Sequence, residues 1–235
     1  MNTKELFSPP EFIPLRKGKL ASKETFRKGE EVFSVIDVGK LSPQDRDPEK
    51  IFYFVSAYID RLNIAGVPII PIKEIERLGN LVIIHTKYFP CFLDEALASG
   101  RVTLEGAITA ILVGVERASA YHLGIDPTPK NFAVDGYQIL YGDFFYPFVP
   151  EYIEWSRKRM DSTCSQNAYI LFSQDSMFFP LVCAHAVSDF LDLRLFDPQN
   201  VTEQFHKLCR EKWPKLDFYK ELEFYKREKQ KVSHY

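Results

Sequence analysis

The sequence lacks the features that mark several common classes of protein. Its cysteines (Cys91, Cys164, Cys183 and Cys209) form no C-x-x-C pair, which argues against a zinc site or a disulfide framework and favours reduced thiols. The first twelve residues have no apolar core of the signal-peptide type. The longest apolar runs are broken well short of a membrane span. We therefore expect a soluble, cytoplasmic protein without a membrane partner.

The chain also lacks a strong charge of either sign. Its net charge is -2 and its isoelectric point about 6.2, so no global field attracts nucleic acid, and we expect no nucleic-acid partner. Apolar residues make up 46% of the 235 residues and charged residues 26%, which is typical of a globular protein with a buried core. This length predicts one large domain, or two lobes that share an interface.

The first third of the chain favours strands around one helix. Residues 12–20 and 30–40 have strand character. Residues 49–66 predict a helix, and residues 67–89 predict two short strands around a Leu-Gly-Asn turn. The apolar positions that recur at helical spacing are Ile51, Phe54, Val55, Tyr58, Ile59 and Leu62.

The rest of the chain favours helices, interrupted by a single hairpin. A short helix is predicted over residues 91–99, a long one after the capping residue Thr103, and further helices after residue 150. This order predicts an α+β fold with a small β-rich lobe over residues 1–90 and a larger, mainly helical lobe over residues 91–235. Together the two lobes form a single domain, with a hinge near residue 90.

The hairpin carries the residues that point to chemistry. The runs NFAV and YQILY flank an Asp-Gly turn, which supplies the positive φ angles of a tight hairpin. Asp126 and Asn131 precede the hairpin and Asp143 follows it. Because a two-stranded ribbon brings its ends together, we expect these three side chains to converge. Carboxylate and carboxamide oxygens are ligands that Mg²⁺ prefers, although aspartates and asparagines also mark ordinary solvated turns.

This stretch resembles the protein-kinase-like fold superfamily, and most closely its aminoglycoside and choline kinase-like branch. In that branch H-G-D-x-x-P-x-N-x-x-x-D leads to I-D-F, whereas this chain reads LGIDPTPKNFAVDG and then YGDFF, with Pro129 in the proline's place. Residues 62–89 resemble the branch's segment that leads into its fourth and fifth strands and hinge. The resemblance covers roughly residues 30–147, in order.

The resemblance implies a two-lobed protein-kinase-like fold that uses ATP and Mg²⁺. Asp126 matches the catalytic base, and Asn131 and Asp143 match the Mg²⁺ ligands. Lys40 is the best match for the lysine on the third strand that clamps the nucleotide phosphates. Glu49 is the candidate for that lysine's partner, and it serves equally well as a first-turn acid that compensates the helix dipole.

The chain departs from the family pattern at several places. Gly124 stands where the branch has a histidine, and His122 is interpreted as a helix-terminal residue. No G-x-G-x-x-G loop is present, and the corresponding residues 16–29 are rich in lysine. We interpret those lysines as a solvated face: Lys17, Lys19 and Lys23. The Val-Pro-Glu at residues 149–151 follows Asp143 too closely for an ordinary activation segment.

Three functions therefore stay open. The first, slightly favoured because all three acidic-loop residues are kept, is an atypical phosphotransferase that moves phosphate from ATP to a small-molecule or specialised protein hydroxyl. The second is a catalytically inactive binding module of the pseudokinase kind, and the third is nucleotidyl transfer. The sequence predicts a nucleotide as ligand, leaves the acceptor unidentified, and allows a protein partner to bind through the helical lobe. The basic residues of the final helix are interpreted as a solvated face.

Overall fold

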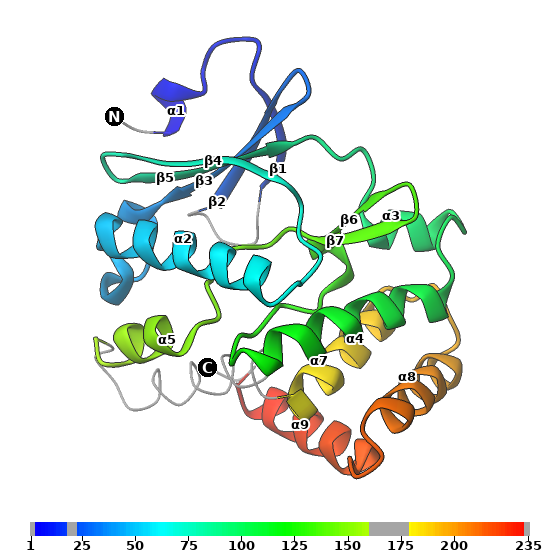
Figure 1. The fold of residues 1–235 in the computed structure, drawn as a ribbon. Coiled ribbons are helices and arrows are strands. Elements are labelled where there is room, and N and C mark those ends of the chain that lie inside the picture. The colour runs from blue at the N-terminus through cyan, green and yellow to red at the C-terminus, as the bar shows by residue number, and fades with distance from the viewer. Residues whose placement is uncertain (1–2, 18–22, 160–178, 233–235) are drawn as a thin grey trace.

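The structure, a computed structural model, describes residues 3–17, 23–159 and 179–232. An antiparallel sheet with strand order β1-β2-β3-β5-β4 forms the small lobe (Figure 1). Its strands are β1 (Ile13–Lys17), β2 (Lys23–Lys28), β3 (Glu31–Asp37), β4 (Ile72–Leu78) and β5 (Leu81–Lys87). Helix α2 (Pro48–Ile64) connects β3 to β4 and lies between the sheet and the helical lobe.

The helical lobe follows β5 in the chain and contains one hairpin. Its helices are α3 (Leu93–Ala98), α4 (Leu104–Ala120), α5 (Pro150–Arg157), α7 (Phe179–Asp192), α8 (Pro198–Lys212) and α9 (Phe218–Val232). The hairpin strands are β6 (Phe132–Asp135) and β7 (Gln138–Tyr141). A short helix, α1 (Thr3–Leu6), lies beyond the outer face of the sheet (Figure 1). The fold is α+β with two lobes, as the sequence predicted.

The two long helices begin and end where their sequences predict. The side chain of Asp47 accepts a hydrogen bond from the backbone N–H of Lys50 at the start of α2, and Thr103 caps α4 in the same way. Such caps satisfy backbone donors that the first turn leaves free. The six apolar positions predicted for α2 are all buried. Gly66 follows α2 with a φ of 69°, a conformation that favours glycine.

Strand β2 was not predicted from the sequence. Among its side chains only Phe26 is buried, so the alternation that indicates a half-buried strand is missing. Its pairing with β3, for example Phe26 opposite Phe33, depends on contacts that a local pattern does not record. The run predicted over residues 12–20 forms β1 only as far as Lys17, and residues 18–22 lie outside the described part of the chain.

The hydrophobic core runs without interruption from the small lobe into the helical lobe. One cluster joins Ile36 on β3 and Ile84 on β5 to α2, α4, α7 and α8. Because the two lobes share this core, the packing does not test the predicted boundary at residue 90, which stays a prediction. A second cluster lies on the outer face of the sheet, where the ring of Phe7 stacks on that of Phe26 at 4.6 Å.

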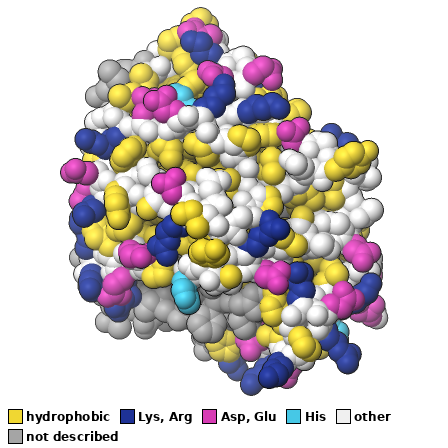
Figure 2. Space-filling model, in the orientation of Figure 1, with side chains coloured by type: hydrophobic (Ala, Val, Ile, Leu, Met, Phe, Trp, Pro, Cys, Tyr) yellow, Lys and Arg dark blue, Asp and Glu magenta, His cyan; other side chains and the backbone are white. Residues whose placement is uncertain are grey.

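Two features of the described residues concern membranes and charge: the helices and the side chains on one face. In the described part of the chain, no helix has both the length and the apolar character that a membrane crossing needs. On the face drawn in Figure 2, basic and acidic side chains are interspersed over both lobes. That distribution agrees with the small net charge of the sequence.

Candidate functional site

The β6–β7 hairpin brings its two ends together. Its turn contains Gly136 with a φ of 60°, and Phe132 pairs with Tyr141 at its base. The backbone N–H of Gly142 donates to the carbonyl of Asn131 at 2.8 Å. Asp143 is the next residue, so the backbones of Asn131 and Asp143 lie side by side. The two ends of the ribbon meet as expected, whereas the convergence of the Asp126, Asn131 and Asp143 side chains stays a prediction.

A buried chain of hydrogen bonds holds the loop that carries Asp126. The backbone N–H of Asp126 donates to the hydroxyl of Tyr141 at 3.2 Å, and the hydroxyl of Tyr141 bonds that of Tyr58. The hydroxyl of Tyr58, on α2, then donates to the carbonyl of Gly124 at 2.6 Å. Burial raises the pKa of both tyrosines well above the ordinary value. Both hydroxyls therefore keep their protons, and the small lobe fixes the loop directly.

The carboxylate of Asp126 lies among polar groups of the helical lobe. It accepts hydrogen bonds from the backbone N–H of Thr128 at 3.0 Å and from the Thr128 hydroxyl at 2.5 Å. The same hydroxyl lies 2.6 Å from Oδ2 of Asp189 on α7, and Nε2 of His185 is 3.1 Å from that oxygen. Sequence reasoning missed His185 and Asp189. Their only signal was a His-x-x-x-Asp spacing of about one helical turn inside an apolar helix.

Asn131 carries a polar group without a hydrogen bond. Its Nδ2 atom is buried and has no partner among the described residues, which is rare for a buried amide. A half-turn of the amide puts Oδ1 in the same place. A carboxamide oxygen beside the Asp143 backbone fits the donor set that Mg²⁺ takes.

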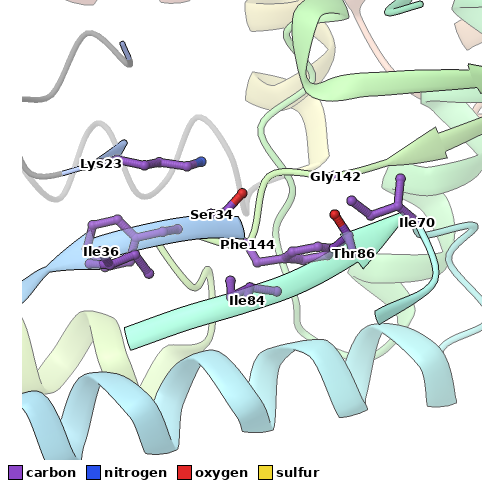
Figure 3. Close-up of a pocket in the computed structure, with 9 residues that line it drawn as sticks. Lys23, Ser34, Ile36, Ile70, Ile84, Thr86, Gly142 and Phe144 are labelled. Atoms are coloured by element: carbon purple, nitrogen blue, oxygen red, sulfur yellow. The ribbon is translucent and has the colours of Figure 1, made fainter. Parts of the chain in front are cut away.

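The side chain of Lys23 contacts the carboxylate of Asp143. Its Nζ forms an ion pair and hydrogen bond with Oδ1 of Asp143, and only 23% and 20% of the two side chains are exposed. The interpretation of Lys23 as part of a solvated face was therefore wrong. Figure 3 shows the side chain of Lys23 extending from β2 across the space beside Ser34 and Phe144. Sequence reasoning missed this role because β2 itself was not predicted.

Lys40 and Glu49 take up other surroundings. Lys40 ends a short 3-10 helix after β3 and pairs with Asp37 at 3.1 Å and Glu24 at 3.3 Å. The hydrogen bond that Lys40 donates to Asp37 is the largest influence and raises the pKa of Lys40; burial opposes this rise, and the hydrogen bond to Glu24 adds to it. Glu49 is exposed in the first turn of α2. Their predicted partnership stays a prediction, and the lysine that contacts Asp143 is Lys23.

The space beside the Lys23–Asp143 pair is narrow. The cavity there has a volume of about 10 Å³, which is about the space that one water needs. Its walls are mainly apolar and come from β3, β5, the segment before β4 and the segment after Asp143 (Figure 3). The lining residues include Ile36, Ile70, Ile84, Phe144 and Phe145. Among the described residues, side chains leave little free space beside this ion pair.

Comparison with solved structures finds similar chains, and WbdD is one of them. No protein-family model matches the chain, and no curated protein matches it. The chain is similar to WbdD, known from a 2.2 Å crystal structure, at 14% sequence identity and a TM-score of 0.46. The match covers 91% of this chain and 49% of that one, so the chain spans about half the length of WbdD. A likeness at this level carries no conclusion about what the chain binds or does.

Proposed function

We propose that the chain is an atypical kinase-like phosphotransferase that uses ATP and Mg²⁺. Support comes first from the order of its parts. A five-stranded antiparallel sheet with one helix before its fourth strand precedes a connecting segment, a long helix and a hairpin flanked by acids. This is the order that the resemblance to the aminoglycoside and choline kinase-like branch implies.

The observation that carries the proposal is the contact between Lys23 and Asp143 between the two lobes. In a magnesium–nucleotide complex, a lysine in this position would face the phosphate charge and an aspartate would face Mg²⁺. The lysine offers three donors to phosphate oxygens. We therefore assign to Lys23 the phosphate-clamping role that the sequence assigned to Lys40.

The remaining roles follow from the hairpin. Asn131 and Asp143 would hold Mg²⁺, which neutralises phosphate charge when bound. Asp126 would accept the proton of the acceptor hydroxyl, held in place by the hydrogen bonds of its loop to Tyr141 and Tyr58. The acceptor is a small molecule or a specialised protein, because only five residues lie between Asp143 and Val149, the residue that caps α5.

A non-catalytic, pseudokinase-like binding module is the second candidate, and the filled inner cleft favours it. The cavity of about 10 Å³ is far smaller than the roughly 300 Å³ of a typical small-molecule site. Nucleotide binding therefore requires the lobes to separate or the side chains near Phe144 to move. A module that binds a partner through its helical surface needs neither change.

Nucleotide binding to matched lysine variants tests the proposal. A ligand at 100 times its Kd stabilises the folded state by about 2.7 kcal/mol, so thermal unfolding with and without ATP and Mg²⁺ detects it. We expect a Mg²⁺-dependent rise in melting temperature for the wild type and for Lys40→Met. We expect none for Lys23→Met or Asp143→Asn.

Two other results would redirect the proposal. A shift lost in Lys40→Met but kept in Lys23→Met would return the clamping role to Lys40. No shift with the wild type at saturating nucleotide would favour the binding module. Where a shift is found, the mass added to acceptor candidates separates phosphoryl from nucleotidyl transfer.

A further inference from the structure

Three potential metal ligands meet beside the loop that carries Asp126. His185 and Asp189 lie one turn apart on α7, and Asp126 follows α4. One ligand atom from each of the three lies within 4.8 Å of the other two. The side chains of His185 and Asp189 are 12% and 16% exposed, so the cluster is mostly enclosed but still reachable from solvent.

The Thr128 hydroxyl lies between the carboxylates of Asp126 and Asp189, an arrangement that a positive charge nearby would stabilise. Thr128 Oγ1 lies 2.5 Å from Oδ1 of Asp126 and 2.6 Å from Oδ2 of Asp189. A hydroxyl has one proton and therefore donates to only one of these oxygens. The other contact needs a further proton or a cation nearby. His185, 3.1 Å from the same Asp189 oxygen, supplies either a proton or a nitrogen ligand.

We propose that Asp126, His185 and Asp189 form a binding site for Zn²⁺, separate from the Mg²⁺ site proposed at Asn131 and Asp143. One imidazole nitrogen with two carboxylate oxygens is a donor set that suits Zn²⁺, whereas Mg²⁺ takes oxygen ligands. The Thr128 hydroxyl, which lies beside both carboxylates, or a water would supply the fourth ligand.

The geometry requires only a small adjustment. Zinc–ligand bonds of about 2.0–2.2 Å place neighbouring tetrahedral ligands about 3.5 Å apart. No two of the three ligand atoms lie more than 4.8 Å apart, and small side-chain rotations bring them to that spacing. The backbone of the Asp126 loop stays in place, because it is hydrogen-bonded to the hydroxyls of Tyr141 and Tyr58.

Zinc at this site regulates the enzyme, a consequence that rests on the proposed function. Asp126 cannot bind the ion and accept a substrate proton at the same time. Bound Zn²⁺ therefore inhibits phosphotransfer, and the inhibition is relieved by a chelator that leaves Mg²⁺ in solution. The binding itself does not depend on catalysis and is measured without nucleotide.

Equilibrium dialysis of the full chain against Zn²⁺ at neutral pH tests the site. We expect one tightly bound ion in the wild type, and an affinity lower by at least about tenfold in His185→Gln and in Asp189→Asn. The matched control is His206→Gln, because His206 packs on Phe218 and Tyr219 elsewhere in the helical lobe. Melting temperatures without metal show whether each variant is folded. If one of the two α7 variants does not fold, the other decides the outcome.

Two results would overturn the zinc site. The first is equal zinc affinity in the wild type and the folded His185 or Asp189 variant, including no binding in either. The second is loss of zinc binding in Asp143→Asn rather than in the α7 variants, because the ion would then lie at the other end of the hairpin. Failure of ATP binding, with zinc binding intact, would refute the proposed function and leave this site standing.

Discussion

Removing one buried hydroxyl tests how the small lobe holds the Asp126 loop. Tyr58→Phe deletes the donor to the Gly124 carbonyl, a hydrogen bond of 2.6 Å at a fully buried side chain. It also removes the acceptor for the Tyr141 hydroxyl. An unsatisfied buried polar group costs about 1–3 kcal/mol. Allowing for some relaxation around the site, we expect a loss of about 2 kcal/mol in the free energy of unfolding.

Urea unfolding and thermal melting measure this loss. For a chain of this size, about 2 kcal/mol corresponds to a fall of roughly 4–8 °C in melting temperature. The urea midpoint is expected to fall without a change in slope. Tyr53→Phe is the matched control, because Tyr53 lies on the same helix with 62% of its surface exposed, and it is expected to change stability by less than about 0.5 kcal/mol.

The refuting result is a Tyr58→Phe protein as stable as the Tyr53→Phe control. A double-mutant cycle with Tyr141→Phe adds a second criterion. Because both hydroxyls belong to one hydrogen-bonded chain, the double variant is expected to lose less stability than the sum of the two single variants. Strict additivity would mean that the two tyrosines act independently.

Three further predictions follow from buried or capping residues. Burial raises the pKa of Asp45 above 3.8, and the hydrogen bond from Ser156 opposes this rise. The raised pKa of Asp45 therefore stabilises the folded state below pH 3.8, and this stabilisation is lost as the pH rises through the folded-state pKa. Asp45→Asn is therefore expected to melt higher than the wild type near neutral pH and no higher at acidic pH. Phe7→Ala, which removes the stack on Phe26, is expected to cost about 3 kcal/mol in urea unfolding. Thr103→Ala, which removes the cap of α4, is expected to cost about 1 kcal/mol by the same measurement.

Each of these has an outcome that contradicts it. A melting difference between Asp45→Asn and the wild type that does not change with pH would mean that Asp45 does not titrate differently on folding. An unchanged urea midpoint in Phe7→Ala would mean that the segment before β1 does not pack on the sheet. An unchanged midpoint in Thr103→Ala would mean that water replaces the cap at no cost.

The elements with strong local patterns were predictable from the sequence. Helix α2 repeats apolar residues at a spacing that only a helix places on one face, and all six are buried. The hairpin was predictable because Asp135 and Gly136 specify a tight turn. Its two ends then had to meet, and Gly142 bonds Asn131 as that geometry requires.

The residues that act across long distances in the chain were not predictable. Lys23 contacts Asp143 across 120 residues, and the polar strand that carries it has no local signal. His185 and Asp189 reach Thr128 and Asp126 only because α7 packs in the core beside α4. A single sequence contains the side chains of such a cluster but not the tertiary packing that brings them together.

The uninterrupted core has a consequence for how the molecule unfolds. Because the sheet, α2 and α4 belong to one buried cluster, neither lobe is expected to lose its packing while the other keeps its own intact. Calorimetry should then give a single heat-absorption peak, with equal calorimetric and van't Hoff enthalpies. Any separation of the lobes to admit a ligand has to be a limited sliding of packed helices, since a wide hinge rotation would break the cooperative unit itself.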